Sequence, residues 1–213
     1  MSPKIGIIGA GKLGTALARM FAGSYENVAI INSRAPDSLK LQLQILLPGV
    51  QAMEVHELIK WADIIILATP LRQYQTLPLS EMAGKIVVDA MNYWSPVDGK
   101  IAEFEKYADS SSELIAQSIP GARIVKTLNT VAYSELEEHA LPKGDEKRRA
   151  IALAGDDTDA NALVAQLIDA IGFDAVTIGM LKNGTLLQPD TELFNVRVTA
   201  DEMYAVLDRL QKV

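Results

Sequence analysis

The sequence predicts an α/β fold built on one doubly wound, mainly parallel β-sheet with helices on both faces. Short β-branched runs alternate with helix-length segments along the 213 residues, which is the pattern of βαβ units. The run at residues 64–68 is apolar at every position, as strands buried on both faces are. A glycine-rich turn at residues 9–14 joins the first run to a helical segment, which is typical of a Rossmann-type fold.

Each element follows from its own pattern. Strands are expected where apolar residues run without a break, and helices where apolar residues recur every three or four positions between capping residues. In chain order, the predicted strands are residues 4–8, 28–31, 49–53, 63–70, 85–90, 123–128, 150–154 and 173–178, and the predicted helices are residues 13–23, 37–46, 56–61, 110–119, 158–171 and 200–210. We expect one NAD(P)-binding domain over residues 1–213, in which the strands at about 150–178 extend the same sheet and a tail follows from about 180 to 213.

Composition narrows the possible partners. The chain is 49% hydrophobic with a mean hydropathy of +0.13, enough for a large core. A net charge of −7 and a pI of about 4.9 argue against a general nucleic-acid surface. Without cysteine there are no disulfides, thiolate nucleophiles or cysteine-ligated metals. The apolar runs are too short for a membrane span or a signal peptide, so we expect a cytoplasmic protein with no membrane partner.

The turn at residues 9–14 matches the GxGxxG pattern in its expected context, between a strand and a helix. Gly9 permits the tight turn, Gly11 lets the backbone approach a pyrophosphate, and Gly14 lets the helix pack closely on the strand. The start of the helix then offers free N–H groups and a positive dipole end to the phosphates. The predicted cofactor-binding residues of this turn are Gly9, Ala10, Gly11, Lys12, Leu13 and Gly14.

The second predicted strand ends in Asn32, Ser33 and Arg34, where NAD-binding chains commonly place a carboxylate. Losing that carboxylate removes the repulsion of a 2′-phosphate. Ser33 can donate its hydroxyl, and the Arg34 guanidinium can fork onto the phosphate or stack on adenine. Two charged hydrogen bonds, each contributing ~1.5–3 kcal/mol, favour NADP over NAD by roughly two to three powers of ten. These three residues are therefore assigned to the cofactor, and the cofactor to NADP(H).

Six segments along nearly the whole chain resemble one family. In order, they read GIIGAGKLGTALA, INSR, IVVDAMN, PGARIVKTLNTV, IALAGDD and LLQPDTELFN. They are similar to the coenzyme F420-dependent NADP oxidoreductases, the NADPH-dependent deazaflavin reductases. The resemblance implies hydride transfer between NADP(H) and a small-molecule redox acceptor with a flat ring, either a flavin or a deazaflavin.

By the same resemblance, Ser33 and Arg34 hold the 2′-phosphate, and Ala68, Thr69 and Pro70 line the cofactor cleft. Asn92 and Asn129 would lie near the nicotinamide or the acceptor ring, and they are the candidates for a catalytic role. The sequence departs from the family after Asn92, where relatives often continue with proline and this chain has Tyr93 and Trp94. Those aromatic side chains either stack on a flavin-like ring or fill the pocket themselves.

Two other functions stay open. A carbonyl or imine reductase would need a proton donor, for which Lys126 and Tyr93 are candidates. A non-catalytic NADP-binding module would bind the cofactor without oxidising it, since a fold does not fix a function.

For several polar residues a structural role is the favoured interpretation. Asp89 is expected to cap a loop or bind backbone N–H groups rather than act as an acid, and Lys126 to have a salt-bridge or edge role. His56 and His139 are expected at the surface, and the glutamates of residues 134–139 on a solvated helix face.

The remaining acidic cluster and the tail complete the expectations. Asp156, Asp157 and Asp159 precede or open a helix, where the dipole favours carboxylates, so we predict no metal site. The apolar tail at residues 186–198 can cover a second subunit, and we predict a homodimer.

Overall fold

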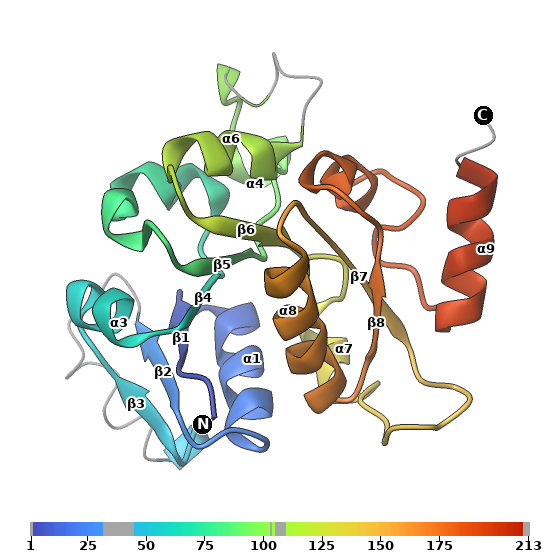
Figure 1. Ribbon diagram of the computed structural model, residues 1–213, viewed down its shortest axis with the longest axis horizontal. Helices are drawn as coiled ribbons and strands as arrows, with labels where there is room; N and C mark the ends of the chain where they lie inside the picture. Colours follow the sequence, from blue (N-terminus) through green and yellow to red (C-terminus); the bar gives the residue numbers. More distant parts are fainter. Residues whose placement is uncertain (1, 32–44, 103, 105–109, 211–213) are drawn as a thin grey trace.

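The computed structural model describes residues 2–31, 45–102, 104 and 110–210. In this part of the chain eight strands form one sheet in the order β3-β2-β1-β4-β5-β6-β7-β8 (Figure 1). The doubly wound, mainly parallel architecture is thus confirmed. The strands are β1 (Ile5–Ile8), β2 (Val28–Ile31), β3 (Val50–Ala52), β4 (Ile64–Leu67), β5 (Ile86–Asp89), β6 (Arg123–Lys126), β7 (Ala150–Gly155) and β8 (Asp174–Thr177).

The central strands are parallel and are buried on both faces. In the register of the sheet, Ile5 pairs with Val28 on one side and with Ile64 on the other. Every residue of β1, β2, β4 and β5 is buried. Continuous apolar runs are therefore required here, because neither face of these strands meets water.

The sheet reverses direction at one place that the sequence did not predict. β6 and β7 pair antiparallel through Val125 with Gly155 and Lys126 with Ala154, and β8 then pairs parallel to β7. The first six strands and the last two consequently point opposite ways, and the carboxyl-terminal edge of the main sheet is formed by β1, β2, β3, β4, β5 and β6 alone.

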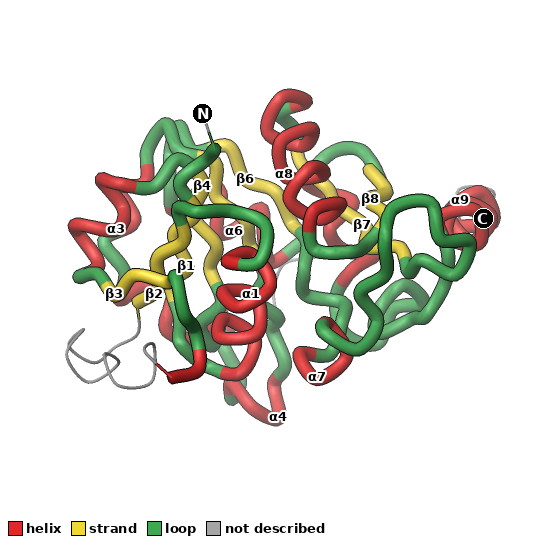
Figure 2. The backbone as a smooth tube through the Cα atoms, turned by 90° about the horizontal axis from the view of Figure 1, so that it is seen from below, coloured by secondary structure: helices red, strands yellow, loops and turns green. Residues whose placement is uncertain are grey.

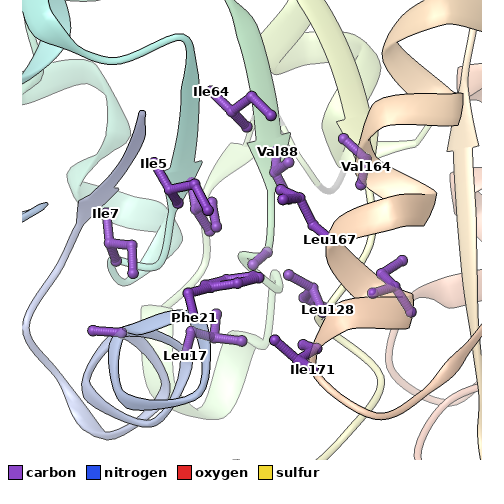
Figure 3. Packing of buried hydrophobic residues seen from close by; sticks show 14 of the residues in the cluster. Ile5, Ile7, Leu17, Phe21, Ile64, Val88, Leu128, Val164, Leu167 and Ile171 are labelled. Carbon is purple, nitrogen blue, oxygen red and sulfur yellow. The ribbon is translucent and has the colours of Figure 1, made fainter. Parts of the chain in front are cut away.

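One face of the sheet is covered by α1 (Lys12–Ala22), α8 (Thr158–Ala170) and the short α7 (Tyr133–Leu136). Figure 3 shows Leu17 and Phe21 of α1 and Leu167 of α8 packed over strand residues such as Val88. The spacing of Gly14, Leu17, Ala18 and Phe21 on α1 is the i, i+3, i+4, i+7 pattern of a buried helical stripe.

The opposite face is covered by shorter helices. Leu58 and Ile59 of α3 and Ile115 of α6 pack against Ile65 and Val87 of the sheet. The elements on this side are α3 (Val55–Trp61), the 3₁₀ helices η1 (Leu71–Thr76) and η2 (Leu79–Met82), and α6 (Ser111–Ser118). The 3₁₀ helices were not predicted, because a 3₁₀ helix of one or two turns is too short to show an apolar periodicity.

A third cluster stabilises the last two strands. Val176 of β8, Leu187 of η3 (Leu181–Leu187) and Met203 of α9 (Ala200–Leu210) belong to it. Figures 1 and 2 place α9 at the opposite end of the molecule from α3. That residues 1–213 form one domain stays a prediction.

Two arginines of a charged loop are unexpectedly buried. Arg148 is 2% exposed and its guanidinium contacts Asp169 at 2.7 Å and Asp174 at 2.8 Å. Arg149 is 4% exposed; it donates to Glu135 at 2.8 Å and to the Val196 carbonyl. These ion pairs fasten the start of β7 to α8, α7 and the tail.

The predictions for the acidic segment and for His139 were partly wrong. Glu135 lies between Arg149 and Arg197, and its side chain is only 17% exposed, so it belongs to an ion-pair network rather than to a solvated face. His139 is half-buried beside Glu135, because the helix turn places residues i and i+4 together. His56 is exposed as predicted and contacts Glu81.

We expect Glu135→Gln to destabilise the protein by about 2 kcal/mol at neutral pH, since charged hydrogen bonds are lost. Hydrogen bonds from Arg197 and then Arg149 lower the pKa of Glu135 below its ordinary value of 4.5. A carboxylate with a lowered folded-state pKa stabilises above the unfolded value, and the contribution disappears as pH falls through the folded pKa. The free energy of urea unfolding of the variant and the wild type should therefore converge on acidification.

The control for this experiment is Glu146→Gln, which changes an exposed glutamate of the neighbouring loop. It should alter stability by less than about 0.5 kcal/mol at any pH. A gap between Glu135→Gln and wild type that stays constant from neutral to acidic pH would contradict the assignment.

None of the helices in the described ranges has the length and apolar character that crossing a bilayer requires.

Candidate functional site

The candidate site lies at the edge of the sheet where the parallel strands end. Three consecutive backbone bonds align the loops there: Gly9 N–H to Ile31 O at 2.8 Å, Ala68 N–H to Ile8 O at 2.9 Å, and Ala90 N–H to Leu67 O at 3.1 Å. The turns after β1, β4 and β5 are thereby held side by side. In open α/β sheets this edge is where ligands bind.

The glycine turn has the geometry that its pattern predicts. Gly9 has a φ of +123°, and an added Cβ would lie 2.5 Å from the Ala68 carbonyl oxygen. At Gly14 an added Cβ would lie 1.8 Å from the Gly9 carbonyl oxygen, so only glycine lets α1 approach the turn this closely. At Gly11 no atom of the described residues would lie within 4 Å of an added Cβ. The backbone at Gly11 is thus open to a ligand on the side where a side chain would project.

The start of α1 suits an anion. Its N-cap is Gly11, which has no side chain to satisfy the first N–H groups, and its first turn is Lys12, Leu13 and Gly14 without a carboxylate. A cavity of about 590 Å³ opens here, lined among others by Gly11, Lys12 and Thr15 of the turn and by Tyr133. The free N–H groups, the helix dipole and the bare Gly11 backbone fit a pyrophosphate.

Lys12 borders this cavity and contacts α7. Its ammonium donates to the Tyr133 hydroxyl at 3.0 Å and lies 5.1 Å from the centre of that ring. The hydrogen bond with Tyr133 raises the pKa of Lys12. Its positive charge therefore lies at the mouth of the cavity.

Asn92 and Asn129 are brought together from two loops. Asn129 Nδ2 donates to Asn92 Oδ1 at 2.8 Å, and Asn92 Nδ2 donates to the Asn129 carbonyl at 2.9 Å. Asn129 Nδ2 also donates to the Leu187 carbonyl at 2.6 Å, which adds η3 to the assembly. The two amides thus connect the loops after β5 and β6 with η3.

The backbone before Asn129 is strained. Leu128 has a φ of +61°, a left-handed conformation that is rare for a bulky residue. Leu128 is 1% exposed, so core packing holds it there while the loop turns toward Asn92. Strain of this kind concentrates at functional sites.

A buried polar cluster supports the loop after β5, and its full extent could not be found from sequence. Asp89 accepts from Met91 N–H at 3.0 Å, from Ser112 Oγ at 2.6 Å and from Lys126 Nζ at 3.4 Å. Lys126 also donates to the Met91 carbonyl. Asp89 therefore caps the loop that carries Asn92, as predicted.

Of the salt-bridge and edge roles predicted for Lys126, the structure has the salt bridge, with Asp89 at 3.4 Å. It is 1% exposed, and its aliphatic stem lies against Gly184, where an added Cβ would be 3.2 Å from Lys126 Cγ. Burial lowers the pKa of Lys126, although Asp89 opposes the shift. The sequence signal for this cluster was an aspartate and a lysine that stand at matched positions of two adjacent apolar strands.

The two aromatic residues after Asn92 have different surroundings. The Tyr93 ring stacks on Phe104 with centres 5.4 Å apart, and its hydroxyl contacts Gly99 and Ile101. These contacts hold the Tyr93 side chain against the protein. Trp94 is 54% exposed, and both aromatic residues line a smaller cavity of about 240 Å³.

The predicted site residues therefore fall into two groups. Gly9 to Gly14, Ala68, Thr69, Pro70, Asn92 and Asn129 lie in the loops at one edge of the sheet, where Thr69 Oγ1 contacts Met91 Sδ at 3.6 Å. Asn32, Ser33 and Arg34 lie outside the described residues, so their contact with a cofactor stays a prediction.

The helix-capping interpretation of the acidic cluster holds. Asp157 caps α8 by accepting from Ala160 N–H at 2.7 Å, and Asp156 accepts from Leu181 N–H at 2.9 Å at the start of η3. Among the described residues there is no group of three or more histidine or acidic side chains that could hold a metal ion.

Comparison with known proteins identifies the family. Residues 4–93 match the family described as NADP oxidoreductase, coenzyme F420-dependent. A hypothetical protein of Sinorhizobium meliloti is 32% identical, with a TM-score of 0.79 over 92% of this chain and 95% of that chain. The chain belongs to the coenzyme F420-dependent NADP oxidoreductase family. Membership indicates an NADP-dependent oxidoreductase with NADP(H) as its cofactor.

Two further proteins are similar to this chain. A protein of Arthrobacter sp. FB24 that has been assigned as an F420-dependent NADP reductase has a TM-score of 0.72 at 24% identity, over 99% of this chain and 94% of that one. The rat metalloreductase STEAP3 is 28% identical over 183 residues, which are 84% of this chain. The chain spans about a third (34%) of the length of STEAP3.

Proposed function

We propose that this chain transfers a hydride between NADP(H) and a flavin-like or deazaflavin acceptor. The observation that carries the proposal is the bare Gly11 backbone at the start of α1, beside the amides of Asn92 and Asn129 at the same edge of the sheet. One end of that edge suits a pyrophosphate and the other presents polar groups to a flat ring.

Different residues of the chain bind different parts of the cofactor. N–H groups at the start of α1 bind the pyrophosphate, and the Lys12 charge attracts the dinucleotide. Thr69 and Pro70 line the path toward Asn92 and Asn129, whose interlocked amides orient the nicotinamide end. The bound cofactor supplies the hydride. The chain's contribution to the rate is positioning, which is sufficient when a hydride passes directly between two rings.

The contacts of the two proton donors that the sequence suggested, Lys126 and Tyr93, favour a ring acceptor over a carbonyl or imine. Lys126 is 1% exposed and held by Asp89 and Met91, and Tyr93 Oη contacts Gly99 and Ile101. Both candidates for general acid are thus engaged within the protein. A carbonyl reductase needs such a donor at the substrate oxygen, whereas a deazaflavin or flavin takes the hydride at the ring.

The function is tested by following NADPH oxidation with coenzyme F420, FMN, riboflavin and small carbonyls as acceptors. We expect turnover with at least one ring acceptor and none with the carbonyls. Turnover of carbonyls alone would replace the proposal by the reductase alternative. Tight NADPH binding without oxidation by any acceptor would replace it by the non-catalytic module.

Arg34→Ala is expected to weaken NADPH binding about 30-fold and to change NADH binding less than threefold, because a charged hydrogen bond to the 2′-phosphate is lost. Isothermal calorimetry with both dinucleotides measures the difference. Lys147→Ala, which removes an exposed positive charge from the loop before β7, is the control for loss of charge alone. Equal losses for NADPH and NADH would place Arg34 away from the phosphate.

We also propose that the chain is a homodimer, since homodimers are the commonest assembly and the tail at residues 186–198 is apolar in part. Light scattering should give twice the chain mass of 23.1 kDa. A monomeric mass would refute the dimer.

A further inference from the structure

Tyr133 lines the cavity of about 590 Å³ at the glycine turn but belongs to none of the motifs in the sequence. It is the first residue of α7 and is 43% exposed. Its hydroxyl contacts Lys12, which lies 121 residues earlier in the chain. Ligand sites commonly place a few polar groups, such as a tyrosine hydroxyl, at the wall of a cavity. Tyr133 is therefore in a position to contact a ligand of this cavity.

Salt bridges and a core contact hold the helix that carries the tyrosine. Leu136 is 0% exposed, and Glu135 accepts from Arg149 at 2.8 Å. Glu137, at the end of α7, pairs with Arg19 of α1. The helix is thus fastened both to the start of β7 and to α1. The fold, rather than the tyrosine side chain itself, brings the phenol to the start of α1.

The contact between Lys12 and Tyr133 leaves hydrogen-bond donors on both side chains. Lys12 Nζ donates to Tyr133 Oη at 3.0 Å, so the tyrosine oxygen is the acceptor and its own O–H is not used in this bond. An ammonium has further N–H groups and no acceptor. Among the described residues neither side chain has another hydrogen-bond partner. The pair therefore offers only donors to a ligand.

The charge of Lys12 is not compensated, in contrast to that of Arg19 in the same cavity. Arg19 and Glu137 both line the cavity and pair with each other, so their charges cancel. Among the described residues, the partner of Lys12 is a neutral phenol. A cation without a counter-ion, next to groups that only donate, suits an anionic ligand.

We propose that Tyr133 is a phosphate-binding residue of the cofactor site, where its hydroxyl and the Lys12 ammonium donate together to the pyrophosphate of NADP(H). The inference rests on the proposed function and adds a residue of α7 to its cofactor site. The pyrophosphate is the target because Gly11 and Lys12, at the start of α1, line the same cavity as Tyr133. The 2′-phosphate is instead assigned to residues 32–34.

Tyr133→Phe, which removes the hydroxyl and keeps the ring, tests the assignment. It should weaken the binding of NADPH and of NADH about tenfold each, the loss that a hydrogen bond to a charged group supports. Lys12→Met should weaken both about 30-fold. Isothermal calorimetry measures the four Kd values. The midpoint of thermal unfolding of each variant should stay within about 3 °C of wild type, so that a loss of binding is not a loss of folding.

Two variants away from the cavity are the matched controls. Tyr204→Phe removes the hydroxyl of another exposed tyrosine, on α9, which lies far from α1 (Figure 1). Lys147→Met removes an exposed positive charge from the loop before β7. Both should change each Kd less than twofold. Unchanged binding in Tyr133→Phe would overturn the inference. A loss for NADPH alone would also overturn it, because the hydroxyl would then contact the 2′-phosphate.

Phosphorus NMR of bound NADPH identifies the phosphate directly, since the 2′-phosphate and the pyrophosphate give separate resonances. In Tyr133→Phe the pyrophosphate resonances should move and the 2′-phosphate resonance should not; the reverse would overturn the inference. Neither binding measurement needs turnover. The expected losses of binding in a protein that reduces no acceptor would keep the phosphate contact and reject hydride transfer. Full turnover with unchanged binding in Tyr133→Phe would keep hydride transfer and reject the contact.

Discussion

Gly11→Ala is expected to weaken NADPH binding at least tenfold and to leave the midpoint of thermal unfolding within about 3 °C of wild type. Gly11 has φ −74° and ψ −172°, an extended conformation that alanine adopts, and the added Cβ meets no atom of the described residues within 4 Å. The lower chain entropy of alanine in the unfolded state offsets its poorer N-cap preference. The methyl group would stand where the pyrophosphate approaches, so the loss falls on binding.

Gly14→Ala is the matched control, because the same methyl group is added three residues later. There the Cβ would lie 1.8 Å from the Gly9 carbonyl oxygen, which is backbone and cannot rotate away. We expect destabilisation by about 3 kcal/mol or more, as α1 is forced off the turn. Urea unfolding and calorimetric titration with NADPH separate the two effects. A Gly11→Ala protein with wild-type NADPH affinity would contradict the location of the pyrophosphate.

Lys126→Met is expected to destabilise the protein by about 3–5 kcal/mol. Methionine keeps the aliphatic stem beside Gly184 but leaves Asp89, which is 0% exposed, without its cation. The variant also loses the bond to the Met91 carbonyl, so the loop that carries Asn92 is held less firmly. The free energy of urea unfolding at neutral pH measures the effect.

Two further variants make that result interpretable. Lys143→Met removes an ion pair of 3.0 Å with Asp169 in which the lysine side chain is 81% exposed, and it should cost less than about 1 kcal/mol. Adding Asp89→Asn to Lys126→Met should recover part of the lost stability, because the buried charge is gone. A Lys126→Met protein as stable as the Lys143→Met protein would show that the buried pair does not hold the loop.

Much of the fold could be predicted because its central strands are buried on both faces. β2 has the predicted bounds, and the other strands differ by a few residues at their ends. The reversal at β7 could not be predicted, since strand direction depends on how the connection from Asn129 to Arg149 crosses the molecule. The apolar run of β7 would look the same in either direction.

The site could be predicted where a single segment of the sequence determines the local backbone geometry. It could not be predicted where segments far apart in the sequence come into contact. The glycine turn falls in the first class, because close backbone contacts within the fold require glycine at Gly9 and Gly14, and the same turn leaves the backbone at Gly11 open. Arg148 and Arg149 fall in the second: a run of charged residues in a loop indicates exposure, yet acidic partners from α7 and the end of α8 bury both.

The most direct test of direct hydride transfer is the fate of deuterium from NADPH labelled at nicotinamide C4 on either face. With 5-deazariboflavin as acceptor, a hydride delivered ring to ring forms a C–H bond at ring C5, which does not exchange with water, while the nitrogen N1 takes a proton from solvent. Mass spectrometry should find the deuterium in the reduced acceptor for one of the two labelled faces. Reduced acceptor without label from either face, or label released into water, would contradict the stacked arrangement of the two rings at this edge of the sheet.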